Sequence, residues 1–149
     1  MDEEQAVRIL GLDLGERRIG LAVSDPTGTI ASGRGVYTRQ RLDQDLDHLE
    51  RLIEAEGIIE VVLGYPLNMD GSIGERAQQT LAFKEELEAR VEVPVVLFDE
   101  RLSTAEAERV LIEADLSRRR RKRVIDELSA VVILQSYLDW RRASVAEGE

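Results

Sequence analysis

Three apolar runs near the start of the chain predict a small antiparallel meander. They cover Val7 to Asp13, Arg18 to Ser24 and Thr29 to Thr38, the last interrupted by glycines. Two short polar segments separate them, Leu14-Gly15-Glu16-Arg17 and Asp25-Pro26-Thr27-Gly28, and both are rich in residues that favour tight turns. We therefore expect three neighbouring strands joined by hairpins.

The middle of the chain alternates between helical and strand patterns. Apolar residues recur at helical spacing between positions 42 and 53, with acids between them, and Gly57 supplies a stop signal. A β-branched run follows from Ile58 to Gly64, then a loop, a helix from about Glu75 to Arg90 and a strand from Val93 to Phe98. This order of elements predicts parallel pairing with right-handed crossovers.

The last third of the chain predicts two helices. Ser103-Thr104-Ala105-Glu106 has the spacing of a capping box, so we expect a helix from Ser103 to about Asp115. A basic run interrupts it, and a largely apolar helix is expected from about Val124 to Trp140. The pattern as a whole predicts one α/β domain over residues 1–149, with a frayed tail from about 141.

Composition narrows the classes of function. At 149 residues without a cysteine, the chain has room for one catalytic module and excludes disulfides, thiolate nucleophiles and cysteine-bound metals. No apolar run reaches the length of a membrane span, and the start of the chain is acidic where a secretory signal would be basic. We expect a cytoplasmic protein with no membrane partner.

Charge is distributed unevenly along the chain. The net charge of −10 argues by itself against a polyanionic partner. A cationic run nevertheless enters the last helix, whereas acids crowd the stretches 43–60 and 85–92. The run consists of Arg118, Arg119, Arg120, Arg121, Lys122 and Arg123. It predicts one cationic edge that contacts phosphates on an otherwise acidic body, although such a run can also be a solvated linker.

Three acidic residues lie at the ends of predicted apolar elements. Asp13 ends the first apolar strand, Glu100 follows the last one, and Asp126 lies in the first turn of the apolar helix. A carboxylate in such a setting is costly unless something uses it. Asp126 also shares a helical stripe with apolar positions at 130, 133 and 137, so it should face inward. Their convergence on one sheet edge predicts a metal site.

Each acid also has a structural alternative. Asp13 could accept backbone N–H groups at a strand-to-turn corner, and Asp126 could complement the dipole of its helix. Asp99 could replace Glu100 as the ligand, or it could pair with Arg101. If the three acids do act together, they can hold one or two Mg²⁺ or Mn²⁺ ions, which prefer oxygen ligands.

The loop from Tyr65 to Gly74 is a second candidate for function. Ten residues are long for a strand-to-helix connection, which usually takes about 2 to 6. As a structural alternative, the loop is a long turn built on its glycines. A loop beside the acids could embrace a nucleic-acid backbone, and we predict that Asn68, Asp70 and Arg101 contact nucleic acid.

At the level of motifs the chain resembles the bacterial YqgF (RuvX) family, whose members are described as Holliday junction resolvases and as pre-16S rRNA nucleases. The matching segments follow one another in order over nearly the whole chain. They are Gly11-Leu12-Asp13-Leu14-Gly15 with Arg18-Ile19-Gly20, Gly64-Tyr65-Pro66-Leu67-Asn68-Met69-Asp70-Gly71 with Gly74, Asp99-Glu100-Arg101-Leu102-Ser103, and Val124-Ile125-Asp126-Glu127-Leu128-Ser129-Ala130-Val131 ahead of Ile133-Leu134-Gln135.

The resemblance implies a ribonuclease H-like fold, a five-stranded mixed sheet in the order βββαβαβαα with helices on both faces. It also implies that Asp13, Glu100 and Asp126 are the catalytic and metal-binding acids. The function expected from it is a metal-dependent endonuclease that processes the 5′ end of pre-16S rRNA. The alternatives are resolution of four-way DNA junctions, which favours a homodimer over a monomer, a nucleotide-binding module built on Asp13-Leu14-Gly15, and an inactive nucleic-acid-binding fold.

Overall fold

A five-stranded mixed sheet forms the centre of the molecule. The computed structural model describes residues 6–102 and 118–148. In the last helix it describes side chains for residues 125–144 only. The strands are β1 (Ile9–Leu14), β2 (Arg18–Ser24), β3 (Ala31–Thr38), β4 (Glu60–Tyr65) and β5 (Val95–Asp99), and they lie in the order β3-β2-β1-β4-β5. The β1–β2 and β2–β3 pairs are antiparallel, whereas β1–β4 and β4–β5 are parallel. The expected mixed α/β sheet is confirmed.

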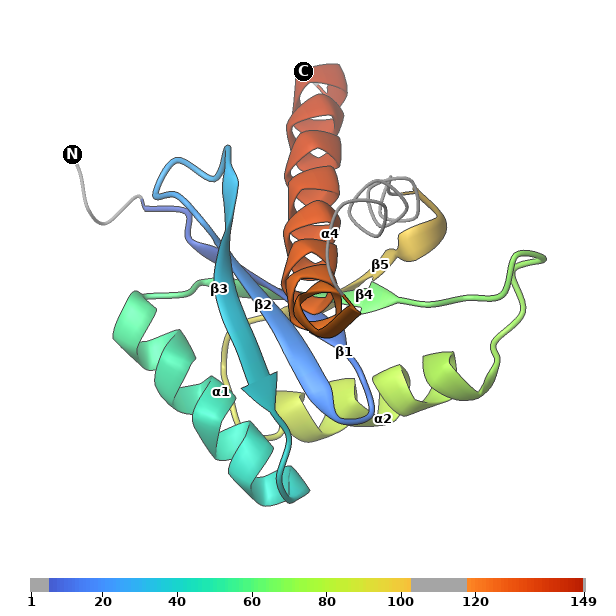
Figure 1. Cartoon of the computed structure of the whole chain (residues 1–149). Coiled ribbons are helices and arrows are strands. Elements are labelled where there is room, and N and C mark those ends of the chain that lie inside the picture. The colour runs from blue at the N-terminus through green and yellow to red at the C-terminus, as the bar shows by residue number, and fades with distance from the viewer. Residues whose placement is uncertain (1–5, 103–117, 149) are drawn as a thin grey trace.

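Helices cover both faces of this sheet. Helices α1 (Leu42–Glu56) and α2 (Glu75–Glu88) lie on one face, and α4 (Arg118–Gly148) lies on the other (Figure 1). A short 3-10 helix, η2 (Glu100–Leu102), directly follows β5. In the described part of the chain no helix has the apolar length required to cross a bilayer.

The central strand β1 is buried on both sides, which explains its nearly continuous apolar sequence. Leu10 and Leu12 contribute to the core beneath α1 and α2, while Ile9 contributes to the core beneath α4. Because side chains alternate along a strand, Gly11 and Asp13 face the same side as Ile9. Asp13 therefore projects from the α4 face of the sheet.

The helix boundaries differ from the expected ones at the C-terminal end. The helix expected at Ser103 to Asp115 lies outside the described residues. The last helix was expected from Val124 to Trp140, and that prediction was too short at both ends, because α4 begins at Arg118 and ends at Gly148. Arginine, lysine and alanine are good helix formers, so neither the basic run nor the tail interrupts the helix before its terminal glycine.

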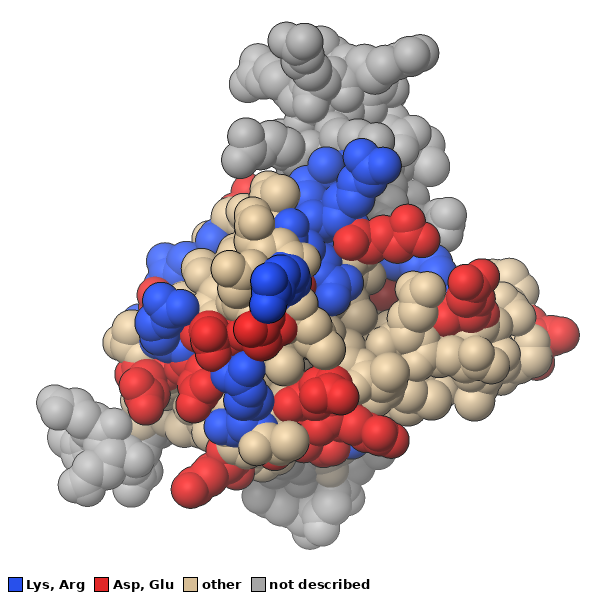
Figure 2. Space-filling view, turned by 90° about the horizontal axis from the view of Figure 1, so that it is seen from below, with Lys and Arg blue, Asp and Glu red and all other residues tan. Residues whose placement is uncertain are grey.

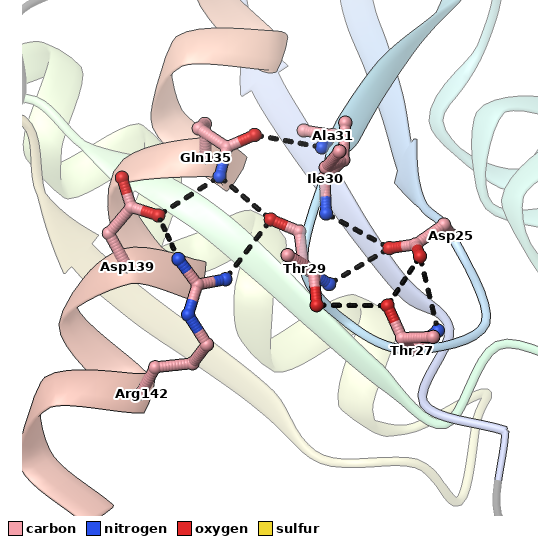
Figure 3. Close-up of polar contacts among 8 residues, drawn as sticks. All are labelled: Asp25, Thr27, Thr29, Ile30, Ala31, Gln135, Asp139 and Arg142. Atoms are coloured by element: carbon pink, nitrogen blue, oxygen red, sulfur yellow. Dashed lines mark hydrogen bonds and ion pairs between the residues drawn. The ribbon is translucent and has the colours of Figure 1, made fainter. Parts of the chain in front are cut away.

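The connection between β2 and β3 is fixed to α4 by a polar network (Figure 3). Asp25 accepts hydrogen bonds from the backbone N–H of Ile30 (2.9 Å), from the Thr27 hydroxyl and from the backbone N–H of Thr29 (2.8 Å), and these bonds hold its pKa well below the usual value. Gln135 of α4 accepts from the Ala31 N–H and donates to the Thr29 carbonyl, each at 2.9 Å. The network fixes the position of α4 along the sheet.

A buried ion pair supports the turn between β1 and β2. Asp45, on α1, is completely buried and accepts hydrogen bonds from Arg39 Nε (3.0 Å) and the Gln40 N–H (2.8 Å). The same Arg39 donates through Nη1 to the Gly15 carbonyl at 2.9 Å. The buried carboxylate of Asp45 thus holds the Arg39 guanidinium, which in turn holds the turn that directly follows Asp13.

The substitution Asp45→Asn tests this support. We expect it to lower the free energy of unfolding by about 2 kcal/mol, since it leaves a partly buried guanidinium without its counter-charge. Asp43→Asn is the matched control, because Asp43 is exposed on the same helix and pairs loosely with Arg41 at 3.8 Å; it should change stability by less than about 0.5 kcal/mol. Equal effects of the two substitutions in urea unfolding would refute the role of Asp45.

Candidate active site

Asp13 lies between two glycines at the end of β1. It pairs with Gly20 on β2, and since Leu12 pairs with Leu63 on the parallel strand β4, Gly64 is the next residue on that side. Asp13 is half-buried. Because these two neighbours have no side chains, other elements can come close to the α4 face of the sheet on both sides of this carboxylate.

Helix α4 uses the first of these glycines to approach the sheet. A Cβ atom on Gly20 would overlap with the main-chain oxygen of Asp126. One on Gly11 would lie 2.8 Å from Leu134 Cβ, closer than real Cβ atoms come. These contacts place the part of α4 from Asp126 to Leu134 directly over β1 and β2. Asp126 is thereby placed next to the end of β1.

Glu100 occupies the space over the second glycine. A Cβ atom on Gly64 would lie 2.6 Å from Glu100 Oε2 and 2.5 Å from Ile133 Cδ1. Parallel strands end at the same edge of a sheet, so η2, which follows β5, emerges beside the ends of β1 and β4. The structure therefore brings Asp13, Glu100 and Asp126, from three different elements, to one region of the α4 face.

Asp99, the alternative to Glu100, is engaged elsewhere. Its carboxylate accepts from Arg101 Nη2 at 2.7 Å and from the Arg101 backbone N–H at 2.9 Å. The hydrogen bonds from the Arg101 guanidinium hold the pKa of Asp99 below its usual value, against the opposing effect of burial. Of the two acids, Glu100 is the one that reaches the space beside Asp13.

The carboxylate of Asp126 is paired with an arginine. Arg18 Nε donates to Asp126 Oδ2 at 2.6 Å, and each side chain is 28% exposed. Within residues 6–102 and the described side chains of α4, no three acidic or histidine side chains surround one point closely enough to share an ion. The donor chemistry of Asp13, Glu100 and Asp126 still fits a hard divalent cation, because all three side chains offer only oxygen.

Arginines gather around the β1–β2 turn. Arg76 of α2 donates to the Leu14 carbonyl at 3.3 Å, and Arg17 is exposed on the turn itself. A hollow of about 270 Å³ lies beside Asp126. It is lined by Gly15, Glu16, Arg17, Arg18 and Asp126. Figure 2 shows Lys and Arg concentrated in the upper part of the view, while Asp and Glu predominate in the lower part.

Sequence reasoning overlooked this arginine cluster. Arg17 ends the turn after Asp13 and Arg18 begins the next strand, a signal that the sequence contains, but Arg76 is distant in sequence and joins only through the fold. The predicted basic run from Arg118 to Arg123 forms the first turns of α4, and its side chains lie outside the described part. At 1.5 Å per residue, Arg118 is about 12 Å along the helix from Asp126.

The loop after β4 is organised by its own hydrogen bonds. Asp70 Oδ1 accepts from the Ser72 hydroxyl (2.6 Å) and backbone N–H (2.9 Å), which lower the pKa of Asp70, and Asn68 donates to the Ser72 hydroxyl at 2.9 Å. Arg101 donates to the Met69 carbonyl at 3.3 Å and so connects the loop to η2. Asn68 and Asp70 are exposed side chains that shape the loop beside Glu100.

The fold is that of the ribonuclease H-like resolvases. A solved structure of Thermus thermophilus RuvC in complex with a Holliday junction substrate aligns with a TM-score of 0.61 and 14% identity, covering 93% of this chain and 96% of that one. The fowlpox virus Holliday junction resolvase aligns with a TM-score of 0.52 and 13% identity, covering 89% and 99%. At these identities the likeness concerns the fold alone.

Sequence comparison identifies the family. The model of the RuvX family, described as Holliday junction resolvase, matches residues 7–140, and the chain belongs to this family. A relative from Syntrophomonas wolfei is 51% identical over 133 residues, which is 89% of this chain and 94% of the relative. One from Symbiobacterium thermophilum is 50% identical over 141 residues, 95% and 98% of the two chains. Both carry the name "Putative pre-16S rRNA nuclease".

The contact between Gly20 and α4 can be tested by Gly20→Ala. Because the obstructing atom is main-chain oxygen, the helix itself must move, and we expect the free energy of unfolding to fall by about 2 kcal/mol or more. Gly74→Ala is the control, since its Cβ would meet only the end of the Asn68 side chain at 3.2 Å; it should cost less than about 1 kcal/mol. Similar losses for both variants in urea unfolding would contradict the proposed close contact.

Proposed function

We propose that this protein is a divalent-metal-dependent endonuclease that hydrolyses phosphodiester bonds in structured nucleic acid, and that its substrate is the 5′ end of pre-16S rRNA in the cytoplasm. The observation that carries the proposal is the convergence of Asp13, Glu100 and Asp126 around the end of β1, where Gly20 allows Asp126 and Gly64 allows Glu100 to come close. The names of relatives at about half identity over most of both chains support the RNA substrate.

The three acids would hold Mg²⁺ or Mn²⁺ through carboxylate oxygens from β1, η2 and α4. When bound by these carboxylates, a cation of this kind would supply the means to activate water and to stabilise negative charge on a leaving oxygen. Asp13 lies on β1, which pairs with the antiparallel strand β2 on one side and with the parallel strand β4 on the other. The packing of α4 against the sheet fixes the position of Asp126, and the short helix that follows β5 fixes the position of Glu100.

The arginines around the β1–β2 turn would bind the backbone of the substrate. Arg17 and Arg76 form no ion pair within the described part of the chain, so their charges are available to phosphates at the edge where Asp13 lies. Contacts of this kind position a strand without reading its bases. A local cationic surface can attract phosphates although the whole chain carries −10. The basic run at the start of α4 would extend that surface.

A four-way DNA junction is the second candidate substrate. The description of the RuvX family favours it, and symmetric cleavage of a junction would require two active sites in a homodimer. A nucleotide-binding module is the alternative of another class. Thermal stabilisation by ATP, without any response to nucleic acid, would favour the module over both nuclease hypotheses.

Asp13→Asn tests the catalytic role directly. The protein is incubated with Mn²⁺ or Mg²⁺ and, in parallel, a pre-16S leader RNA, a four-way junction and a linear duplex. We expect the variant to lose about 100-fold or more in cleavage, because a neutral amide is a poor ligand for a hard cation, while it retains binding to nucleic acid. Asp139→Asn, exposed on the same helix as Asp126, is the control. Undiminished cleavage by the Asp13 variant would remove this carboxylate from the mechanism.

The salt dependence of binding tests the arginine surface. If Arg17 and Arg76 each contact one phosphate, the double variant R17Q/R76Q should reduce the slope of log K against log salt by about 1.5. Lys84→Gln provides the control, since Lys84 lies on α2, as Arg76 does, but pairs with Glu88 at 2.8 Å. An unchanged slope in the double variant, measured by fluorescence anisotropy, would place the substrate on another surface.

A further inference from the structure

The ion pair between Arg18 and Asp126 lies within the proposed active site and has no part in the function described so far. The two residues are 108 positions apart, and the fold brings them together where β2 begins and α4 crosses it. The distance of 2.6 Å indicates a strong charge-assisted hydrogen bond. Both side chains line the hollow that opens beside the β1–β2 turn.

This pair conflicts with metal binding by Asp126. A guanidinium that donates to Oδ2 engages one carboxylate oxygen and places a positive charge beside the position of an incoming divalent cation. Arginine cannot release this conflict by losing its proton, since it stays charged at any accessible pH. Asp126 can offer both carboxylate oxygens to a cation only if the guanidinium moves away.

We propose that Arg18 is a positioning residue that exchanges partners: it holds Asp126 before the cation binds, and afterwards it binds a phosphate of the substrate. The inference rests on the proposed function. A guanidinium recognises carboxylates and phosphates by the same paired N–H groups, so the exchange preserves its hydrogen bonding. The hollow of about 270 Å³ lies directly beside the pair and is where the released side chain meets the strand.

The exchange couples the two ligands. In the unliganded protein Arg18 opposes the cation, and in the metal-bound protein the freed Arg18 strengthens binding of nucleic acid. Because thermodynamic coupling is reciprocal, nucleic acid must strengthen metal binding by the same factor. Removing the guanidinium should therefore raise the affinity for the metal in the absence of nucleic acid. It should also reduce the factor by which each ligand strengthens binding of the other.

The first measurement is calorimetric titration of the full chain with Mn²⁺ in the absence of nucleic acid. Arg18→Gln should bind Mn²⁺ at least about threefold more tightly than the unmodified protein, because it removes both the competitor for Asp126 and a repelling charge. Arg18→Lys keeps the charge and should stay closer to the unmodified protein. Arg142→Gln, which breaks a pair with Asp139 on α4, should change nothing. Thermal unfolding of each variant confirms that the fold is retained.

The second measurement is binding of a labelled four-way junction by anisotropy with and without Ca²⁺, which also takes oxygen ligands. Ca²⁺ should strengthen binding to the unmodified protein by a larger factor than binding to Arg18→Gln. Equal or weaker Mn²⁺ affinity in Arg18→Gln, while Asp13→Asn loses it, would overturn the partner exchange and leave the proposed function standing. Equal Mn²⁺ affinity in the unmodified protein and Asp13→Asn would overturn both.

Discussion

The close packing of α4 against the centre of the sheet is the constraint on which the site depends. Gly11 and Gly20 allow the helix backbone to reach β1 and β2 at a distance that any side chain would prevent. Glycines at such a crossing bury no side chain of their own, but they allow the two elements to come close together. The result is that the main chain of Asp126, on the helix, lies over Gly20, the residue that pairs with Asp13 on the central strand.

Electrostatics completes the site in a chain that is acidic overall. Most carboxylates on α1 and α2 are surface groups, and several pair with nearby arginines, as Asp47 does with Arg90. At the end of β1, in contrast, arginines from β2 and α2 converge on a turn that follows an acid. Neighbouring negative and positive groups are the arrangement needed to bind a cation and a phosphodiester side by side. Family membership gives this local pattern its functional meaning.

Local patterns in the sequence predicted the strands and the position of Asp13 well, because the apolar runs and turn residues act over short distances. The apolar run that ends at Asp13 was enough to mark this residue as an acid in an apolar setting. The pairing of Asp99 with Arg101, two positions away, was among the alternatives that the sequence offered, and it is confirmed. The partner of Asp126 could not be predicted, since its pairing with Arg18, 108 positions away, depends on tertiary geometry. The start of α4 was missed because a run of cations resembles a linker, although the same residues have high helix propensity.

Anomalous diffraction from crystals soaked in Mn²⁺ tests the central claim most directly. Our account predicts one or two anomalous peaks within coordination distance of Asp13, Glu100 and Asp126, with the Arg18 guanidinium displaced from Asp126. Density for the cation at any other place, with these three carboxylates left uncoordinated under the same conditions, would contradict the proposal that they form one active site.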